Sequence, residues 1–239
     1  MKLHRFYIPE DKAIKKGELV VGSVFDIHFP ELAHQMKNVL RLRTGEKIIF
    51  FNGNGNEYLS TIVSFEGRTE ISFKIETITQ NDVSFKKEVF LFFSLIKRDN
   101  VDLILQKGTE VGVSHFIPIV SSRSEKKDIN IGRTEKILIE ATEQCGRNAP
   151  PIIHDVMKLE DVFNKFNMSF IVLEKGSVSF TEKDIKDNRV GLLIGPEGGW
   201  TKEEIEMFKE KKANFLSLGS TTLRAETAAV VGSAKILNG

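Results

Sequence analysis

The chain has little of what marks secreted and membrane-spanning proteins. Its single cysteine, Cys145, excludes a disulfide within the chain and is typical of a reducing compartment, so we expect a cytoplasmic protein. The longest apolar run, residues 89–96, has the length of a buried strand and is too short for a membrane span. Residues 1–9 hold no apolar signal-peptide core. We therefore expect no membrane partner.

Motifs of several familiar enzyme classes are missing as well. The segment Gly53-Asn54-Gly55 lacks the third glycine of a dinucleotide fingerprint, and it joins two predicted strands instead of a strand and a helix. The sequence holds no Walker-type phosphate loop and no Gly-x-Ser-x-Gly turn for a nucleophilic serine. Its five histidines are scattered without ligand spacing, so we expect no metal. A bound organic cofactor remains as the source of the chemistry.

What is present is an ordinary globular composition whose pattern changes once along the chain. Of 239 residues, 41% are hydrophobic and 28% are charged, and the net charge of +1 neither requires nor excludes a nucleic-acid partner. The first part reads as β-structure with one short helix over residues 30–40. The turn Asn52-Gly53-Asn54-Gly55 predicts a hairpin. Strands are expected over residues 20–27, 47–51, 58–63 and 71–78.

The polar residues 80–87 indicate a linker, the alternative being a surface loop within one domain. After them, strands alternate with helices, which predicts an α/β fold with a parallel sheet covered by helices. The expected strands are residues 88–96, 115–121, 170–173, 190–194 and 214–218. The expected helices are residues 99–111, 131–145, 202–211 and 226–237.

Two loops near the end of the chain stand where a strand gives way to a helix. The first, Gly195-Pro196-Glu197-Gly198-Gly199, has the backbone freedom to approach a ligand closely. Thr201 and Glu204 behind it form a capping-box pattern that predicts the start of a helix. A plain glycine-rich turn is the alternative explanation for this loop.

The second loop, residues 218–229, enters a helix made mainly of small residues. Arg224 and Glu226 lie on either side of the predicted helix start, where a local ion pair is the simple explanation. Because ligands of open α/β sheets bind outside the carboxyl ends of the strands, the two loops together predict two walls of one small-molecule pocket.

Basic residues gather at strand ends and on the predicted β domain. Any one of them is explained equally well as solvated surface charge, but the set indicates a face that binds nucleic-acid phosphates. An aromatic ring beside them would stack on a base. The residues expected to contact RNA are Arg5, Phe6, His34, Arg41, Lys97, Arg123 and Arg147.

With these features the chain resembles the RsmE family of bacterial 16S ribosomal RNA uridine-N3 methyltransferases, in the SPOUT superfamily. The resemblance extends over nearly the whole length in seven ordered blocks. They are residues 4–7, 34–41, 106–112, 121–124, 140–147, 195–199 and 218–228.

The resemblance implies a PUA-like β-barrel RNA-binding domain over residues 1–73 and a SPOUT-type α/β methyltransferase domain over residues 74–239. The second domain would carry a C-terminal trefoil knot that holds S-adenosylmethionine, and the protein would act as a homodimer on 16S rRNA, within the assembled small ribosomal subunit. The cofactor site would use Leu173, Glu174, Gly195, Pro196, Glu197, Gly198, Gly199, Leu218, Gly219, Leu223 and Arg224.

The chain also departs from the family pattern. Ser220, Thr221 and Thr222 stand where many relatives carry a basic residue followed by an aliphatic or basic one. Asn100 stands where relatives often have Lys or Arg.

Methyl transfer to uridine N3 needs a group that accepts the N3 proton and a cation near O2 or O4. Glu226 or Glu197 is expected to assist as the carboxylate, and Arg224 or Arg123 as the donor. Three alternatives stay open: an RNA-binding module without catalysis, a reductase using a nucleotide cofactor, and methylation of another base or a ribose.

Overall fold

The computed structural model describes every residue except 1–2, 10–13, 17–18, 180, 182–186 and 239. The chain divides into two compact units, and each is described separately below. One comprises Met1–Ser84 with Thr142–Pro150, and the other comprises Phe85–Ala141 with Pro151–Gly239. The expected boundary after residue 73 is corrected, because it falls inside strand β6 (Glu70–Gln80). The division instead lies in the polar segment predicted as a linker.

The first unit is a sheet of six strands in the order β1-β4-β5-β6-β3-β2. Helix α2 (Pro30–His34) continues as one π-helical stretch, η1 (Gln35–Val39), where the sequence predicted a single short helix. Strands β1 and β2 stand at the two ends of this order, so the order does not by itself show a sheet that closes on itself. The closed barrel expected from the resemblance therefore stays a prediction. The strands besides β6 are β1 (Arg5–Tyr7), β2 (Ile14–Lys16), β3 (Val24–His28), β4 (Lys47–Phe51) and β5 (Asn56–Glu66).

Alternating apolar residues of these strands build one core. Phe25 and Ile27 on β3 are buried, as are Ile48 and Phe50 on β4, which is the period-2 pattern of a sheet with one covered face. The predicted hairpin between β4 and β5 is confirmed. Gly53 holds a φ of +87° in its turn, a conformation that side chains with a Cβ rarely adopt.

Residues 142–150 belong to this unit because its first strand is bound to them. The Arg5 guanidinium donates to the carbonyls of Thr142, Glu143 and Arg147 at 3.0–3.1 Å, and it pairs with Glu57 at 2.5 Å. In addition, the Tyr7 N–H donates to the Glu143 carboxylate at 2.9 Å.

The second unit confirms the predicted parallel sheet. Its strands run in the order β10-β8-β7-β12-β11-β13, all parallel, with β9 added beside β8. They are β7 (Glu88–Ser94), β8 (His115–Val120), β9 (Ile152–Ile153), β10 (Met157–Lys158), β11 (Ser169–Ser179), β12 (Arg189–Ile194) and β13 (Asn214–Ser217). Two-residue strands such as β9 carry too little pattern to be predicted.

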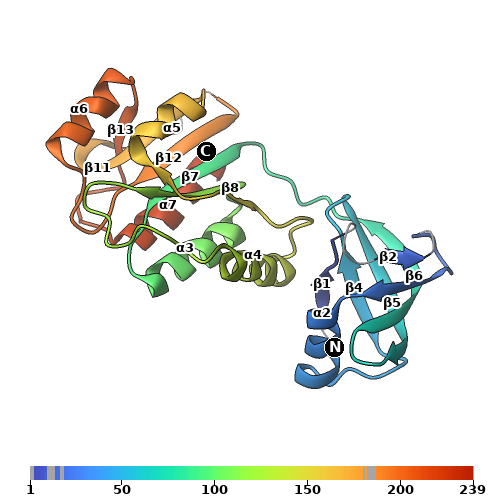
Figure 1. The fold of residues 1–239 in the computed structure, drawn as a ribbon. Coiled ribbons are helices and arrows are strands. Elements are labelled where there is room, and N and C mark those ends of the chain that lie inside the picture. Colours follow the sequence, from blue (N-terminus) through green and yellow to red (C-terminus); the bar gives the residue numbers. More distant parts are fainter. Residues whose placement is uncertain (1–2, 10–13, 17–18, 180, 182–186, 239) are drawn as a thin grey trace. The chain divides into compact units, whose positions relative to one another are not determined.

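Helices cover both faces of this sheet (Figure 1). Val89, Leu91 and Phe93 of β7 pack against α3 (Arg98–Val111), α4 (Ile131–Cys145) and α7 (Ala225–Asn238). Phe90 and Phe92, which alternate with them, face α5 (Leu159–Lys165) and α6 (Lys202–Glu210). Both faces of β7 are therefore buried, which explains its continuous apolar run. Within the described part of the chain, no helix combines the length and apolar character needed to cross a membrane.

Gly108 of α3 offers a test of this packing. A Cβ at residue 108 would lie 2.7 Å from the ring of Phe116, which is fully buried on β8. We therefore expect Gly108→Ala to lower the free energy of unfolding by about 1–3 kcal/mol through overpacking, measured by chemical denaturation. Gly132→Ala at the start of α4 is the control, since its Cβ would meet nothing closer than 3.8 Å. A Gly108→Ala protein as stable as the wild type would contradict this packing.

Candidate functional site

The two loops singled out in the sequence line a single cavity of about 380 Å³ in the second unit. One wall is the loop after β12, and the other is the loop between β13 and α7. The middle of β11 closes the cavity with Leu173, Glu174 and Lys175, where the pairing of β11 with β13 shifts register.

The arrangement of the sheet explains why segments so far apart in sequence meet. Strand β11 lies between β12 and β13, and all three are parallel; Val172 pairs with Leu193 on one side and with Phe215 on the other. Their carboxyl ends therefore reach the same edge, where ligands of α/β proteins bind. Helix α7 also begins there, so Arg224 and Ala225 join the lining.

The structure brings together all but one of the residues expected at the cofactor site. Gly198 is the exception, because it turns its carbonyl toward Arg123 and does not line the cavity. The lining residues outside the expected cofactor set are Lys175, Ile194, Trp200, Ser217, Thr221, Thr222, Ala225 and Ala228, of which the last four lie within the second predicted loop. Several of them are direct neighbours of predicted residues, so extending each loop by one residue would have found them.

The glycine loop is held by Arg123, which lies in the loop that follows β8. Its Nη1 donates to the carbonyl of Gly198 at 2.5 Å and to that of Trp200 at 3.5 Å. Arg123 was expected to contact RNA or to act as a catalytic donor. Its contacts show that it holds the loop, and because its side chain is exposed, both expected roles stay predictions.

The buried carboxylate of Glu204 makes the second attachment. It accepts from the N–H of Thr201 at 2.8 Å, while the Thr201 hydroxyl accepts from the Glu204 N–H at 3.2 Å, which confirms the predicted capping box. The other carboxylate oxygen accepts from the N–H of Ser122 at 2.8 Å. Glu204 thus joins the loops that follow β8 and β12 and holds in place the cavity wall formed by the glycine loop.

Two positions in the glycine loop, Gly195 and Gly199, favour a residue without a Cβ. A Cβ at residue 195 would lie 3.0 Å from the Trp200 ring, so glycine lets the chain pass across the indole. Gly199 has a φ of +67°, which favours glycine at the next bend. The indole N–H of Trp200 has no hydrogen-bond partner among the described residues.

Charged side chains enter the cavity from each wall. Glu174, Glu197 and Arg224 all line it. Partial burial raises the pKa of Glu174 above its ordinary value. On the rim, the ammonium of Lys175 donates to the Thr222 hydroxyl at 2.8 Å and links β11 to the second loop.

Glu226, the other expected catalytic carboxylate, lies elsewhere. Its side chain is 6% exposed on the inner face of α7, and it does not line the cavity. One of its oxygens, Oε2, has no hydrogen-bond partner in the part of the chain that the structure describes. No ion pair joins Glu226 to Arg224, although both residues are described. The structure therefore favours Glu197 over Glu226 as the carboxylate that faces a ligand.

Three of the expected RNA contacts are corrected by burial. Phe6 is 1% exposed in the core of its unit, so its ring is not available to stack on a base. Arg5 is bound to backbone carbonyls and Glu57, and Arg147 is 9% exposed with its pKa lowered by that burial. In contrast, His34, Arg41 and Lys97 lie on the surface, where phosphates have access.

Metal ligands do not cluster in this structure. Among the described residues, no group of three or more His, Cys, Asp or Glu side chains is arranged to hold a metal ion.

Comparison with protein families agrees with this division of the chain. A model described as an RNA methyltransferase domain matches residues 83–237, and one described as an RNA methyltransferase PUA domain matches residues 31–76. The first match covers the whole region that holds the cavity.

Individual relatives match over almost their entire length. The chain is 30% identical to ribosomal RNA small subunit methyltransferase E of Rickettsia conorii, over 99% of this chain and 96% of the relative. A Neisseria gonorrhoeae ribosomal RNA small subunit methyltransferase E, solved with S-adenosyl methionine, is 28% identical with a TM-score of 0.84, covering 98% and 96% of the two chains. A Legionella pneumophila methyltransferase solved with bound SAM is 27% identical with a TM-score of 0.87, covering 99% and 97%.

The raised pKa of Glu174 predicts how the stability of the ligand-free protein depends on pH. Because the folded state holds this proton more tightly than the unfolded state, the stabilising contribution is present below the unfolded pKa and lost as the pH rises through the folded pKa. At pH 7, Glu174→Gln removes a desolvated charge, so we expect a higher Tm than for the wild type. This gain should shrink as the pH falls and disappear toward about pH 3, where the carboxyl is protonated in both states.

The measurement is thermal unfolding of both proteins across this pH range, with exposed Glu210→Gln as the control. A Glu174→Gln protein that is less stable than the wild type at pH 7 would show that the carboxylate is stabilised by its surroundings.

Proposed function

The chain belongs to the ribosomal RNA small subunit methyltransferase E family, and we propose that it transfers a methyl group from S-adenosylmethionine to N3 of a uridine in 16S ribosomal RNA. The observation that carries this proposal is the single cavity at the carboxyl ends of β12, β11 and β13, walled by a glycine-rich loop and the start of a helix.

The residues that line the cavity fit this cofactor. The volume of about 380 Å³ lies in the range of small-molecule sites. Leu173, Ile194 and Leu218 offer apolar surface to an adenine ring, while the glycine loop offers backbone donors and acceptors to its edge. Glu174 offers carboxylate oxygens to the ribose hydroxyls or to the positive charge of the cofactor. When bound, S-adenosylmethionine supplies an electrophilic methyl carbon attached to a sulfur that leaves as a neutral thioether.

The chain has to orient the uridine and remove its N3 proton, since protonated N3 is a poor nucleophile. We assign the acceptance of this proton to Glu197, directly or through a water, because its carboxylate lines the cavity. As N3 attacks the methyl carbon, the carbon–sulfur bond breaks and its electron pair stays on sulfur. Arg224, on the opposite wall, would stabilise negative charge on the uracil oxygens.

The PUA domain and the surface cations account for how RNA is held. His34 and Arg41 lie on the surface of the first unit and Lys97 lies on the surface of the second, where each can meet a phosphate. The target uridine has to lie in a loop or be splayed out, since N3 is hidden within a helix. We propose that the substrate is 16S rRNA in the assembled small subunit and that the protein acts in the cytoplasm.

Two further features of the fold belong to this proposal. The loops that follow β12 and β13 share one cavity, and α7 turns back to pack against β7 and β12, an arrangement that supports a C-terminal trefoil knot. Leu103 on α3 and Val231 on α7 are exposed apolar residues on two helices that pack together, which supports a homodimer formed through this pair.

The first test combines cofactor binding with methyl transfer. We expect calorimetry to show micromolar binding of S-adenosylmethionine and no binding of reduced nicotinamide dinucleotides. Labelled methyl groups should then enter small ribosomal subunits that lack the modification, and nuclease digestion should release 3-methyluridine. A protein that binds RNA but no S-adenosylmethionine would be a non-catalytic RNA-binding module, and a different methylated nucleoside would exclude uridine N3.

The role of Glu197 is tested by Glu197→Gln, which keeps the shape of the side chain and removes its basicity. We expect kcat to fall by roughly 10²–10⁴, the usual contribution of a positioned general base, with the affinity for S-adenosylmethionine unchanged. Glu203→Gln is the matched control, because Glu203 is exposed in the first turn of α6 and does not line the cavity. A Glu197→Gln enzyme with wild-type kcat would remove Glu197 from the mechanism.

A further inference from the structure

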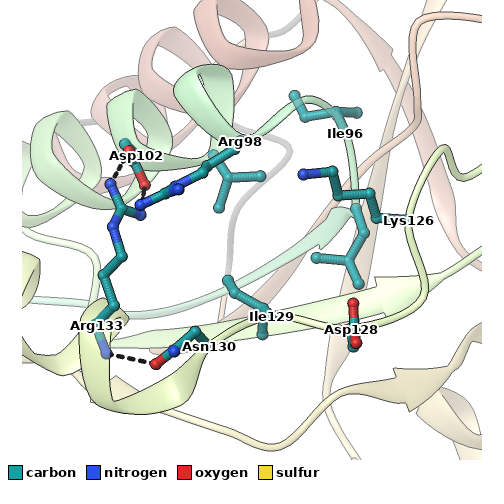
Figure 2. A pocket seen from close by; sticks show the side chains of 10 residues that line it. Ile96, Arg98, Asp102, Lys126, Asp128, Ile129, Asn130 and Arg133 are labelled. Atoms are coloured by element: carbon teal, nitrogen blue, oxygen red, sulfur yellow. Dashed lines mark hydrogen bonds and ion pairs between the residues drawn. The ribbon is translucent and has the colours of Figure 1, made fainter.

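A second cavity, of about 490 Å³, opens on the same edge of the sheet as the cofactor cavity (Figure 2). It lies where β7 gives way to α3 and where the loop that follows β8 leads into α4. Nothing in the proposed cofactor site or in the N3 chemistry uses it.

Strand order places the two cavities close together. Strands β7 and β12 are neighbours, with Ile194 paired to Phe93, so Leu95 in the second cavity follows β7 just as Gly195 follows β12. Adjacent strands in a sheet are separated by about 4.8 Å. A polymer lying along this edge can therefore occupy both cavities.

The second cavity is rich in cations, two of which are unpaired. Arg133 forms a two-pronged ion pair with Asp102, in which Nη1 donates to Oδ1 at 2.5 Å and Nη2 donates to Oδ2. By contrast, Arg98 and Lys126 have no hydrogen-bond or ion-pair partner among the residues that the structure describes. Figure 2 shows Lys126 reaching into the cavity from the side opposite Arg133 and Asp102.

Helix α3 adds to this preference for an anion. Its N-cap, Lys97, provides no side-chain cap, and the helical hydrogen bonds begin with the N–H groups of Asn100 and Val101. The N–H groups at the start of such a helix need an acceptor from outside it. Asp128, the other acidic residue of the lining, lies on the same loop as Lys126.

The remaining lining is apolar. Leu95 and Ile96 are almost completely buried, whereas Ile129, which lies opposite Ile96 in Figure 2, is half-buried. Unpaired cations beside an apolar floor match the two chemical parts of a nucleotide, which are a phosphate and a flat base. The volume also suits a ligand of that size.

We propose that this second cavity binds a nucleotide of the substrate RNA that flanks the methylated uridine. Its phosphodiester lies between Arg98 and Lys126, and its base rests on the half-buried side chain of Ile129. The inference rests on the proposed function and adds a second point of attachment to it, one that fixes which uridine reaches the cofactor cavity.

The test compares Arg98→Ala, Lys126→Ala and the double variant with Lys127→Ala, an exposed neighbour that does not line the cavity. Methyl transfer is measured on small ribosomal subunits that lack the modification, and the affinity for S-adenosylmethionine is measured by calorimetry. We expect KM for the subunits to rise about tenfold for each lost cation, the scale of a hydrogen bond to a charged group. The salt dependence of binding should weaken by about one phosphate contact for each variant.

Both kcat and the affinity for S-adenosylmethionine should stay at the wild-type level, as should every parameter of Lys127→Ala. A double variant with wild-type KM and salt dependence would overturn the inference. An equal loss of affinity for S-adenosylmethionine would also overturn it, because the effect would then act through the cofactor cavity.

A titration with uridine 5′-monophosphate and with inorganic phosphate tests whether the second cavity binds RNA or a small free ligand. Tight binding of either, lost in the double variant without a change in KM, would assign the cavity to a free ligand and refute the RNA site. A wild-type protein that binds S-adenosylmethionine but methylates no subunit would instead refute the proposed function. If the wild-type protein methylates the subunits and the variants do so equally well, only the proposed RNA site in the second cavity is refuted.

Discussion

The parallel pairing of β12, β11 and β13 is the constraint on which the candidate site depends. Strands that run in the same direction deliver their carboxyl ends to one edge, so loops separated by about twenty residues or more become neighbours. The core holds this register because Gly191 of β12 leaves the space that the ring of Phe170 fills, and a shift by one residue would place a larger side chain there. The position of the cavity therefore follows from the parallel pairing of these strands.

Close packing keeps α7 at the distance that this cavity needs. A Cβ on Gly232 of α7 would lie 2.8 Å from Leu173, and one on Gly191 of β12 would lie 2.7 Å from the ring of Phe170. Glycine at these positions lets helix and strands approach more closely than larger residues permit. The small residues of the last helix thus let it lie close to the sheet, and two of them, Ala225 and Ala228, line the cavity together with the loops.

The sequence was sufficient for the α/β sheet, the capping box at Thr201 and most of the cavity lining, because each of these depends on local pattern. It was insufficient for Arg5 and Phe6, which read as an exposed basic and aromatic pair. A three-residue strand shows too little alternation to reveal which side chain is buried, and Arg5 finds its acceptors more than 130 residues away. The inward orientation of Glu226 and the second cavity likewise depend on tertiary packing.

The bonds of Arg5 also bear on how this chain can be divided. Its guanidinium is held by carbonyls from residues 142–147, a segment that the chain supplies only after it has begun the other unit. The N-terminal unit is thus discontinuous in sequence, and a fragment that stops at residue 84 carries Arg5 without its carbonyl acceptors. Recombination that exchanged this unit between proteins as one uninterrupted piece would leave residues 142–150 behind.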